Sequence, residues 1–300
     1  MKTIFFIGYT VRDIVGLLPE DIASPPEEAI TAHRMEDFMV GFGGKAANAA
    51  IHCAKTDSGV THYIGTVGTD FEQMGYDRYL TAQSVKIDHV FRVDRTTPVF
   101  LVLNAPEKQH IFHLPYLYNP DENKRFLSHT ESTLQAQSPD LIYVALGNNT
   151  MIQRTLKQAK ASGSQTAWNP FFHTKTKPDF VACLPYTDIL FLNEIEAATM
   201  TERLNVDITQ IQATFGVKVI CVTMGERGCQ VVEGESVTIV PAPKATQEVD
   251  PTGAGDAFAG TFLSHAIADG FISYADCAQH ANQAAAKVVA QLGAHLPTTT

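Results

Sequence analysis

The chain has 300 residues, of which 45% are hydrophobic and 18% are charged. This composition is typical of a large globular α/β protein and excludes a disordered or fibrous chain. The 32 acidic and 22 basic residues give a formal net charge of −10, the wrong sign for a protein whose main partner is nucleic acid or an anionic membrane. No apolar run approaches the roughly 20 residues of a membrane-spanning helix, so we expect a soluble protein with neither kind of partner.

The N-terminal apolar patch of residues 4–7 is too short for the hydrophobic region of a signal peptide, and we expect it to form a buried strand. The cysteines are odd in number, widely spaced and without a C-x-x-C pair that would indicate a zinc or redox site: Cys53, Cys183, Cys221, Cys229 and Cys277. These features predict reduced thiols and a cytoplasmic location.

Short apolar runs alternate with helical patterns along the chain. Residues 3–9, 140–146, 188–192 and 217–223 have the composition of strands buried on both faces of a parallel sheet. Residues 151–162 and 276–292 instead place apolar side chains at helical spacing. The alternation predicts a layered α/β fold.

Two regions, at about residues 11–40 and 87–120, interrupt this alternation. Within the second, residues 87–93, 99–103 and 110–114 have the pattern of antiparallel strands joined by turns. They could form a small, discontinuously inserted sheet that acts as a lid and excludes water from a cleft. An edge extension of the main sheet is the open alternative.

The strongest chemical signal is the loop of small residues at 250–255, which opens into a helix. Backbone N–H groups of Ala254, Gly255 and Asp256 at the helix start would form a pocket for negative charge. The Asp256 carboxylate at its edge could accept the proton of an attacking hydroxyl group. The alternative is that Asp256 only caps the helix.

A second glycine-rich helix start lies near the N-terminus. Lys45 and Asn48 follow Gly43 and Gly44 with a spacing that places both side chains on one helix face, where they could bind sugar hydroxyls or an anion. Asp13 follows the first strand, a position at which α/β sheets place binding groups. A solvated lysine and a turn aspartate are the alternatives.

Four ordered motifs resemble those of the ribokinase (PfkB) family of carbohydrate and nucleoside kinases. They are Gly43-Gly44-Lys45-Ala46-Ala47-Asn48, Asn193-Glu194-Ile195-Glu196, Thr223-Met224-Gly225-Glu226-Arg227-Gly228 and the 250–258 loop. Together with Gly8 and Asn282 they span nearly the whole chain. The resemblance implies a single domain over residues 1–300 with a three-layer α/β/α sandwich, a mostly parallel sheet and a β lid.

The resemblance also implies roles for individual residues. Asp256 would be the general base, and Gly253, Ala254 and Gly255 would supply the anion hole. The acceptor would be bound by Asp13, Gly43, Gly44, Lys45 and Asn48. Thr223, Gly225 and Gly228 would line the ATP site, with Asn282 near the adenine. Asn193 and Glu196 would help place Mg²⁺, and Asp250 and Thr252 would belong to the monovalent-cation (K⁺) site found in many members.

The acceptor stays open at this stage. The form of the first signature favours a sugar whose primary hydroxyl takes the γ-phosphate of ATP. A nucleoside is the alternative, because Phe42, Phe112, Tyr116 and Tyr118 could stack a base, and a phosphosugar is the third candidate. An inactive nucleotide- or sugar-binding protein is the alternative outside enzymes.

Two departures from the family pattern affect these transfers. Pro251 replaces a common threonine beside the cation site, and Gly75 comes later than usual after Gly68 in the loop near the acceptor. A homodimer through the lid is expected by analogy.

Overall fold

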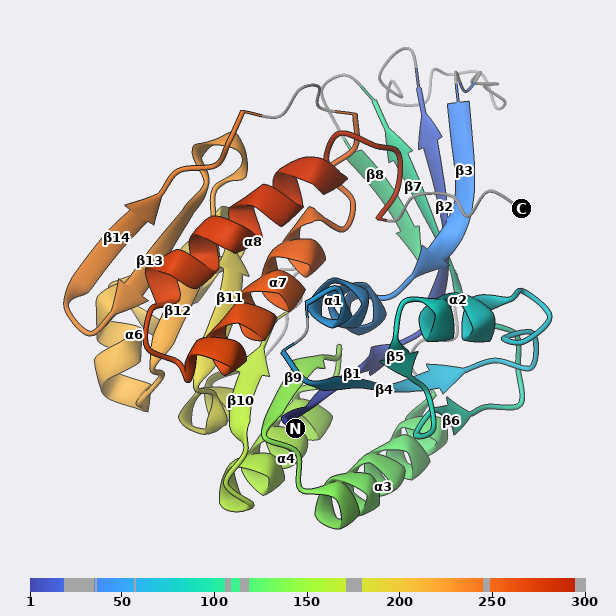
Figure 1. Cartoon of the computed structure of the whole chain (residues 1–300), viewed down its shortest axis with the longest axis horizontal. Helices are drawn as coiled ribbons and strands as arrows, with labels where there is room; N and C mark the ends of the chain where they lie inside the picture. Colours follow the sequence, from blue (N-terminus) through green and yellow to red (C-terminus); the bar gives the residue numbers. More distant parts are fainter. Residues whose placement is uncertain are drawn as a thin grey trace.

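Figure 1 shows the computed structural model of the chain, in which residues 1–18, 35, 37–56, 58–105, 109–113, 119–170, 180–244 and 249–294 are described. The largest element is a ten-stranded sheet in the order β14-β13-β12-β11-β10-β9-β1-β4-β5, with β6 also paired to β4. Its strands are β1 (Thr3–Tyr9), β4 (Val60–Val67), β5 (Val85–Lys86), β6 (Phe91–Arg92), β9 (Leu141–Ala145), β10 (Gln165–Trp168), β11 (Ile189–Asn193), β12 (Val219–Thr223), β13 (Cys229–Glu233) and β14 (Ser236–Val240).

The pairing within this sheet is parallel from β5 through β12 and antiparallel in the β12-β13-β14 meander. The four predicted strands are present as β1, β9, β11 and β12. Strands β1 and β9 are buried along most of their length because helices cover both faces of a parallel sheet. The predicted α/β class is therefore confirmed.

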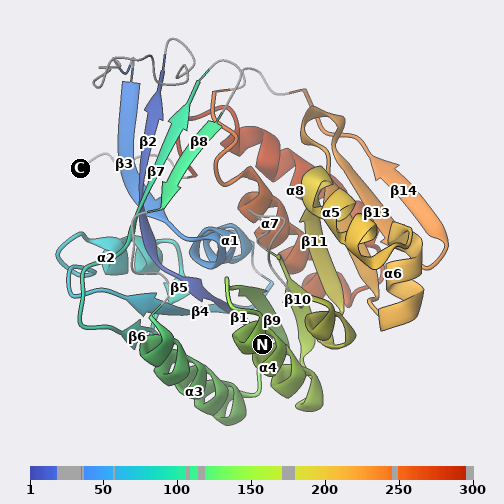
Figure 2. The same ribbon diagram turned by 180° about the vertical axis from the view of Figure 1, so that it is seen from behind.

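Helices form a layer on each face of the main sheet (Figures 1 and 2). One apolar core lies under α1 (Lys45–Ala54), α2 (Tyr76–Ala82), α7 (Ala254–Asp269) and α8 (Tyr274–Val288). The other lies under α3 (Pro120–Gln137), α4 (Asn149–Ala161), α5 (Glu194–Leu204) and α6 (Ile208–Phe215). The result is the predicted three-layer sandwich, although α8 ends at Val288, before Leu292. No helix in the described ranges has both the length and the hydropathy of a membrane span.

A separate four-stranded sheet, which we call the lid, stands at one end of the sandwich (Figure 1). Its order is β3 (Asp37–Gly43), β2 (Val11–Leu17), β7 (Val99–Asn104) and β8 (Gln109–His113). The β2/β3 and β7/β8 pairs are antiparallel, whereas the central β2/β7 pair is parallel. A small sheet was thus correctly predicted, but its first segment reaches Gly43 rather than residue 40.

For residues 87–93 the alternative, an extension of the main sheet rather than a lid strand, is correct. Within this range β6 pairs in parallel with β4, so the segment belongs to the main sheet. The Phe91 ring lies 5.8 Å from the Phe126 ring of α3, and the N–H of Val93 donates to the carbonyl of Val67. Burial of Phe91 against α3 holds the segment on the sandwich, and the lid contribution of this region begins at Val99.

Helices α1 and α7 pack unusually closely because Gly260 has no side chain. A β-carbon at Gly260 would overlap the carbonyl oxygen of Ala49 on α1. Their contact brings the N-terminal ends of both helices to the same side of the sheet, where β1, β10 and β11 also end. The two predicted glycine-rich helix starts therefore meet in space.

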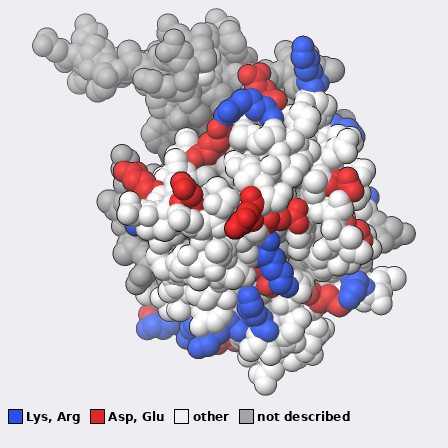
Figure 3. Space-filling view, turned by 90° about the vertical axis from the view of Figure 1, so that its left-hand side faces the viewer, with Lys and Arg blue, Asp and Glu red and all other residues white. Residues whose placement is uncertain are grey.

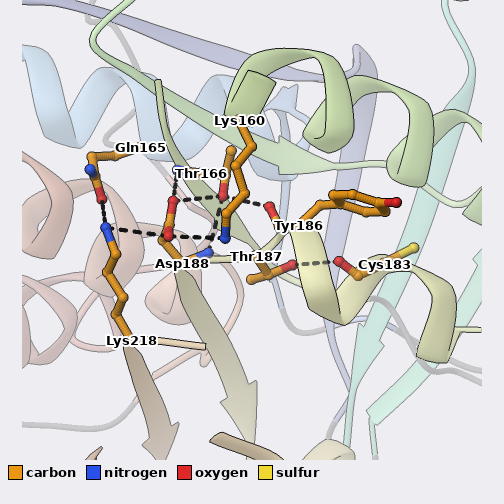
Figure 4. Close-up of polar contacts among 8 residues, drawn as sticks. All are labelled: Lys160, Gln165, Thr166, Cys183, Tyr186, Thr187, Asp188 and Lys218. Atoms are coloured by element: carbon orange, nitrogen blue, oxygen red, sulfur yellow. Dashed lines mark hydrogen bonds and ion pairs between the residues drawn. The ribbon is translucent and has the colours of Figure 1, made fainter. Parts of the chain in front are cut away.

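Two other regions lie away from these helix starts: the outer surface and the edge of the sheet at which the parallel strands begin. On the face shown in Figure 3, the described acidic and basic side chains are interspersed among many uncharged ones. At the N-terminal edge, the buried Asp188 carboxylate lies 3.3 Å from Lys160 Nζ and 3.4 Å from Lys218 Nζ and accepts hydrogen bonds from Thr166 (Figure 4). This network ties α4, β10, β11 and β12 together.

Candidate active site

The two helix starts are joined by one buried hydrogen bond. Asn48 Nδ2 on α1 donates to Asp256 Oδ2 on α7 at 2.9 Å, across 208 residues of sequence. Both side chains are buried, at 4% and 7% exposure. The interaction orients the Asp256 carboxylate and confirms that the two motifs face each other.

The N-terminus of helix α7 is open to a ligand. Gly253, the N-cap residue, has φ of 81°, a conformation that favours glycine, and it packs directly against Ala294. None of the described residues accepts a hydrogen bond from the N–H groups of Gly255 or Asp256, and the space beside Gly255 is open. Two donors and the positive end of the helix dipole are therefore available to an anion.

One of the predicted anion-hole donors already makes a hydrogen bond within the protein. The N–H of Ala254 donates to the carbonyl oxygen of Pro251 at 3.2 Å, which closes a tight turn before the helix. The turn carries the chain from Asp250 into α7, and its internal hydrogen bond satisfies the first donor of the helix. The N–H groups of Gly253, Gly255 and Asp256 have no acceptor among the described residues, whereas that of Ala254 is held in the turn, and the anion-hole role of this loop stays a prediction.

Burial controls the electrostatics of Asp256. Loss of hydration raises the pKa of its carboxyl group from 3.8 to about 6, and the nearby charge of Glu196 acts in the same direction. The charge of Lys45 and the Asn48 hydrogen bond oppose this rise. The group consequently ionises close to neutral pH, where a carboxylate can accept a proton.

The predicted acceptor residues lie around Asp256. Asp13 comes from β2 of the lid, is 8% exposed, and its carboxylate lies so close to Gly43 that no β-carbon would fit between them. Burial, together with the charges of Asp256 and Asp250, raises its pKa from 3.8 to about 7. Gly44 is the N-cap of α1, which begins at Lys45. The structure thus brings all five residues of this predicted set to one place.

Asn169 is a site residue that the sequence analysis missed. It follows β10, is 9% exposed, and accepts a hydrogen bond from Lys45 Nζ at 2.6 Å. Its own amide donates to the carbonyl oxygen of Phe191 at 3.2 Å, which holds it in place. A polar residue directly after a buried strand was the available signal, because strand ends meet at this edge of the sheet.

The residues predicted to place the metal form a reciprocal helix cap. Asn193 Oδ1 accepts from the N–H of Glu196 at 2.8 Å, and Glu196 Oε2 accepts from the N–H of Asn193 at 2.9 Å. Both side chains therefore cap α5, and their role in metal placement stays a prediction. Among the described residues, no cluster of three or more His, Cys, Asp or Glu is arranged to hold a metal ion.

The predicted nucleotide segment lies at the ends of β12 and β13. Thr223 is half-buried at the end of β12, and a turn of 3-10 helix (Gly225–Arg227) follows. Gly228 closes this turn through a hydrogen bond to Gly225. Asn282 on α8 is buried, and its Nδ2 donates to the carbonyl of Val240 at 2.9 Å, so this amide nitrogen anchors the end of β14.

The two residues assigned to a monovalent cation make internal hydrogen bonds. Asp250 is completely buried, and its Oδ1 accepts from the N–H and the hydroxyl of Thr252 and from Asn104 Nδ2. Its Oδ2 accepts from the N–H of Gly293 at 2.7 Å. Both carboxylate oxygens are engaged by protein donors, and the cation role stays a prediction.

Of the aromatic residues considered for base stacking, only the side chain of Phe42 is described. Its ring stacks on Tyr76 at 4.4 Å between centroids, so one face is covered by protein. Tyr116, Tyr118 and the side chain of Phe112 lie outside the described part of the chain.

Comparison with known proteins agrees with this arrangement. The chain matches the pfkB family of carbohydrate kinases over residues 1–300. It is 25% identical to a nucleoside kinase of Methanothermobacter thermautotrophicus over 266 residues, covering 87% of this chain and 82% of that protein. It is 26% identical to a ribokinase of Mus musculus over 263 residues, covering 85% and 78% of the two chains.

Solved structures share the fold. The Methanocaldococcus jannaschii nucleoside kinase superposes with a TM-score of 0.78 at 23% identity, covering 98% of this chain and 93% of that one. A Burkholderia thailandensis nucleoside kinase in complex with inosine gives a TM-score of 0.80 at 19% identity, with 97% and 92% coverage. The resemblance to ribokinases is confirmed: the chain belongs to the pfkB family, and it is a ribokinase-like sugar or nucleoside kinase that uses ATP with a divalent metal ion.

Proposed function

We propose that this kinase transfers the γ-phosphate of ATP to the primary hydroxyl of a ribose unit, with Asp256 as the general base. The observation that carries the proposal is the position of Asp256. Its buried carboxylate is oriented by Asn48 and lies in the first turn of α7, beside the open N–H groups of Gly255 and Asp256. A base and an anion hole therefore lie side by side.

The proposed reaction is a single displacement. The hydroxyl oxygen of the acceptor forms a bond to the γ-phosphorus as the bond between that phosphorus and ADP breaks, and the hydroxyl proton passes to Asp256. Negative charge on the transferring group is held by the N–H groups of Gly255 and Asp256. Because phosphoryl transfer depends mainly on positioning and charge neutralisation, one carboxylate with a pKa near 6 suffices as the base.

We propose that the divalent metal ion is Mg²⁺ and that it binds near Glu196. Carboxylate oxygens are ligands that Mg²⁺ prefers, and Mg²⁺ usually keeps several waters and binds substrate phosphates. Glu196 is buried, and its charge reaches Asp256. When bound with ATP, the ion would neutralise phosphate charge. Glu196 would hold its water shell, while Asn193 keeps Glu196 in place through the helix cap.

The acceptor is proposed to be free ribose, with a nucleoside as the second candidate. Ribose is favoured by the Gly-Gly-Lys-x-x-Asn form of the first motif, whose Lys45 and Asn48, together with Asp13 of β2, offer several polar groups near Asp256. A nucleoside is favoured by the relatives named nucleoside kinases, one of which was solved with inosine. Both acceptors present the same hydroxymethyl group.

The test is a panel assay of ADP formation with ATP and Mg²⁺ and one acceptor at a time. D-ribose, D-fructose, adenosine, inosine and fructose 6-phosphate represent the candidate classes. Turnover with ribose or a nucleoside, and its loss in Asp256→Asn, is the expected result. ATP binding without turnover of any acceptor would instead indicate an inactive binding protein.

The lid is also proposed to mediate a homodimer. The terminal strand β3 exposes Phe38 and Val40, at 60% and 44%, on a sheet edge where a second copy could pair. Light scattering on a gel-filtered sample should give twice the monomer mass, and Phe38→Glu should halve it. A monomeric wild-type protein would contradict this assignment.

A further inference from the structure

The buried Asp250 carboxylate connects three segments that are far apart in the sequence. Asn104 Nδ2, at the end of lid strand β7, donates to Oδ1 at 2.8 Å across 146 residues. The N–H and hydroxyl of Thr252, in the loop that precedes α7, donate to the same oxygen at 3.0 and 2.7 Å. The N–H of Gly293, in the turn after α8, donates to Oδ2. One carboxylate thus links the lid, the anion-hole loop and the C-terminal turn.

A second set of contacts connects the same segments. Met39 of lid strand β3 lies directly against Gly293, and Ala294 lies directly against Gly253, the N-cap of α7. Figure 1 shows the turn after α8 passing beside the lid. The position of Gly253 therefore depends on the C-terminal turn, which itself contacts Met39 of the lid and, through Gly293, the Asp250 carboxylate.

Loss of the hydrogen bond between Asn104 and Asp250 should be energetically costly. A buried carboxylate that loses one of its donors retains the full cost of its desolvation, so removal of Asn104 is unfavourable unless water reaches the site. Movement of β7 away from the sandwich would break this bond, because the Asn104 side chain extends from the lid to the carboxylate. The loop before α7 would then lose one of the hydrogen bonds that hold Asp250 in place.

The acceptor site lies on the same lid strands. Asp13 on β2 is paired in register with Phe100 on β7, and Leu17 at the end of β2 is paired with Asn104. An acceptor bound to Asp13 would hold β2, and through the parallel ladder it would hold β7 and Asn104. Acceptor binding at Asp13 is therefore connected to the shape of the anion hole through β7 and the Asn104–Asp250 hydrogen bond.

We propose that Asn104 is a positioning residue that couples acceptor binding on the lid to the anion hole at the start of α7. The proposal rests on the kinase function proposed above. It assigns to Asn104 the task of completing the hydrogen bonding of Asp250 when the lid is closed, which in turn fixes Thr252 and Gly253. Asn104 itself touches neither reacting group.

The first experiment needs no ligand and compares Asn104→Ala and Asn104→Asp with wild type by hydrogen exchange. Exchange of the hydrogen-bonded amides of Thr252 and Ala254 should accelerate by about tenfold in Asn104→Ala, because the buried carboxylate that holds this loop loses a donor. It should accelerate more in Asn104→Asp, which places a second carboxylate against Asp250. If Asn104 only filled space, the nearly isosteric aspartate would be the milder change, and that order would overturn the proposal.

Asp37→Ala is the matched control. Asp37 is exposed, lies on β3, and is paired with the same residue, Leu17, from the other side of β2. Its removal perturbs the lid at the same level without reaching Asp250. Exchange at Thr252 and Ala254 should stay at the wild-type rate, and an acceleration equal to that of Asn104→Ala would contradict a specific role for Asn104.

The second experiment measures coupling by calorimetric titration of a non-hydrolysable ATP analogue with Mg²⁺, with and without D-ribose or inosine. In wild type, the acceptor that is turned over should tighten nucleotide binding about fivefold or more. In Asn104→Ala this factor should fall to about 1, with nucleotide affinity in the absence of acceptor changed less than about twofold. Unchanged coupling would overturn the proposal. If neither acceptor is a substrate, the kinase proposal fails, while the exchange experiment still decides the role of Asn104.

Discussion

Helices α5 and α7 both begin at the same side of the sheet and both carry an acidic residue at their third position, yet they use it differently. In α5, Glu196 folds back onto the N–H of Asn193, and the Asn193 side chain accepts from Glu196. In α7, the N-cap is Gly253, which has no side chain to form such a cap, and Asp256 pairs with Asn48 of another helix. At the first helix start the cap satisfies two N–H donors, whereas at the second the N–H groups of Gly255 and Asp256 have no acceptor among the described residues.

Two similar sequence patterns thus acquire different roles through the residue at the N-cap. A capping box satisfies two backbone N–H donors, which can then no longer bind a ligand, and it stabilises the helix. A glycine N-cap forgoes that stabilisation and exposes the positive end of the helix dipole. The proposed division of labour is therefore catalysis at α7 and metal placement at α5. Substitutions at the acidic residues and their neighbours can separate the two.

The largest effect is expected for Asp256→Asn. The amide keeps the shape and the contact with Asn48 but removes the proton acceptor, so kcat should fall by about 10²–10⁴-fold with nearly unchanged substrate affinity. Steady-state kinetics with the acceptor identified by the panel, combined with calorimetric binding of ATP, provides the measurement. A kcat within about twofold of wild type would show that Asp256 is not the base.

Asp13→Asn should weaken acceptor binding while stabilising the fold. Removal of a buried carboxylate that faces the acceptor should raise the acceptor KM by about 10–100-fold, from the loss of one charged hydrogen bond. Because the folded pKa is about 7 and the ordinary value is 3.8, ionised Asp13 opposes folding. Wild type therefore loses stability as the pH rises from about 4 through about 7.

The matching measurement is thermal unfolding at pH 5 and pH 8. Asp13→Asn should be more stable than wild type at pH 8 by about 1–4 kcal/mol, with a smaller difference at pH 5. A variant that is equally destabilised at both values would contradict the burial of a charged Asp13.

Glu196→Gln tests the α5 side of the comparison. Glutamine also completes a capping box, so the melting temperature should stay close to that of wild type. Loss of the carboxylate should raise the Mg²⁺ concentration needed for half-maximal activity by about tenfold, an effect of the size seen for residues that support a metal site. Unchanged Mg²⁺ dependence would leave Glu196 with a capping role alone. Glu196→Ala is the control that removes both functions and should cost about 1 kcal/mol of stability.

The smallest effect is expected for Lys45→Met in the pH dependence of kcat. The charge of Lys45 lowers the pKa of Asp256, which burial has raised to about 6. Since Asp256 acts as a base when ionised, activity should fall on the acidic side. In the variant this acidic limb should move to higher pH by up to about one unit. A limb that stays in place would show that the Lys45 charge does not reach Asp256.

Sequence reasoning predicted the parallel core and the motifs well because both depend on local patterns. Apolar runs mark buried strands, and Gly253 and Asp256 lie within one short segment. The pattern could not show that the Ala254 N–H closes a turn, since Gly255 beside it has the same local context. It could not show either that Asp256 pairs with Asn48 of another helix whereas Glu196 caps its own helix.

Other features of the site depend on contacts over long sequence distances. The bonds between Lys45 and Asn169 and between Asn104 and Asp250 join residues 124 and 146 positions apart, and no local periodicity predicts them. The two alternatives left open for the segment at 87–93 have a related cause. Its strand β6 has two residues, too short for any alternation to indicate whether it pairs with the lid or with β4.

The role of Asp256 is best decided by a crystal structure with a non-hydrolysable ATP analogue, Mg²⁺ and the acceptor. We expect the terminal phosphate to accept hydrogen bonds from the N–H groups of Gly255 and Asp256, with the acceptor hydroxyl oxygen about 3 Å from the Asp256 carboxylate. A terminal phosphate bound elsewhere, with Asp256 still bonded only to Asn48 and remote from the acceptor, would contradict it.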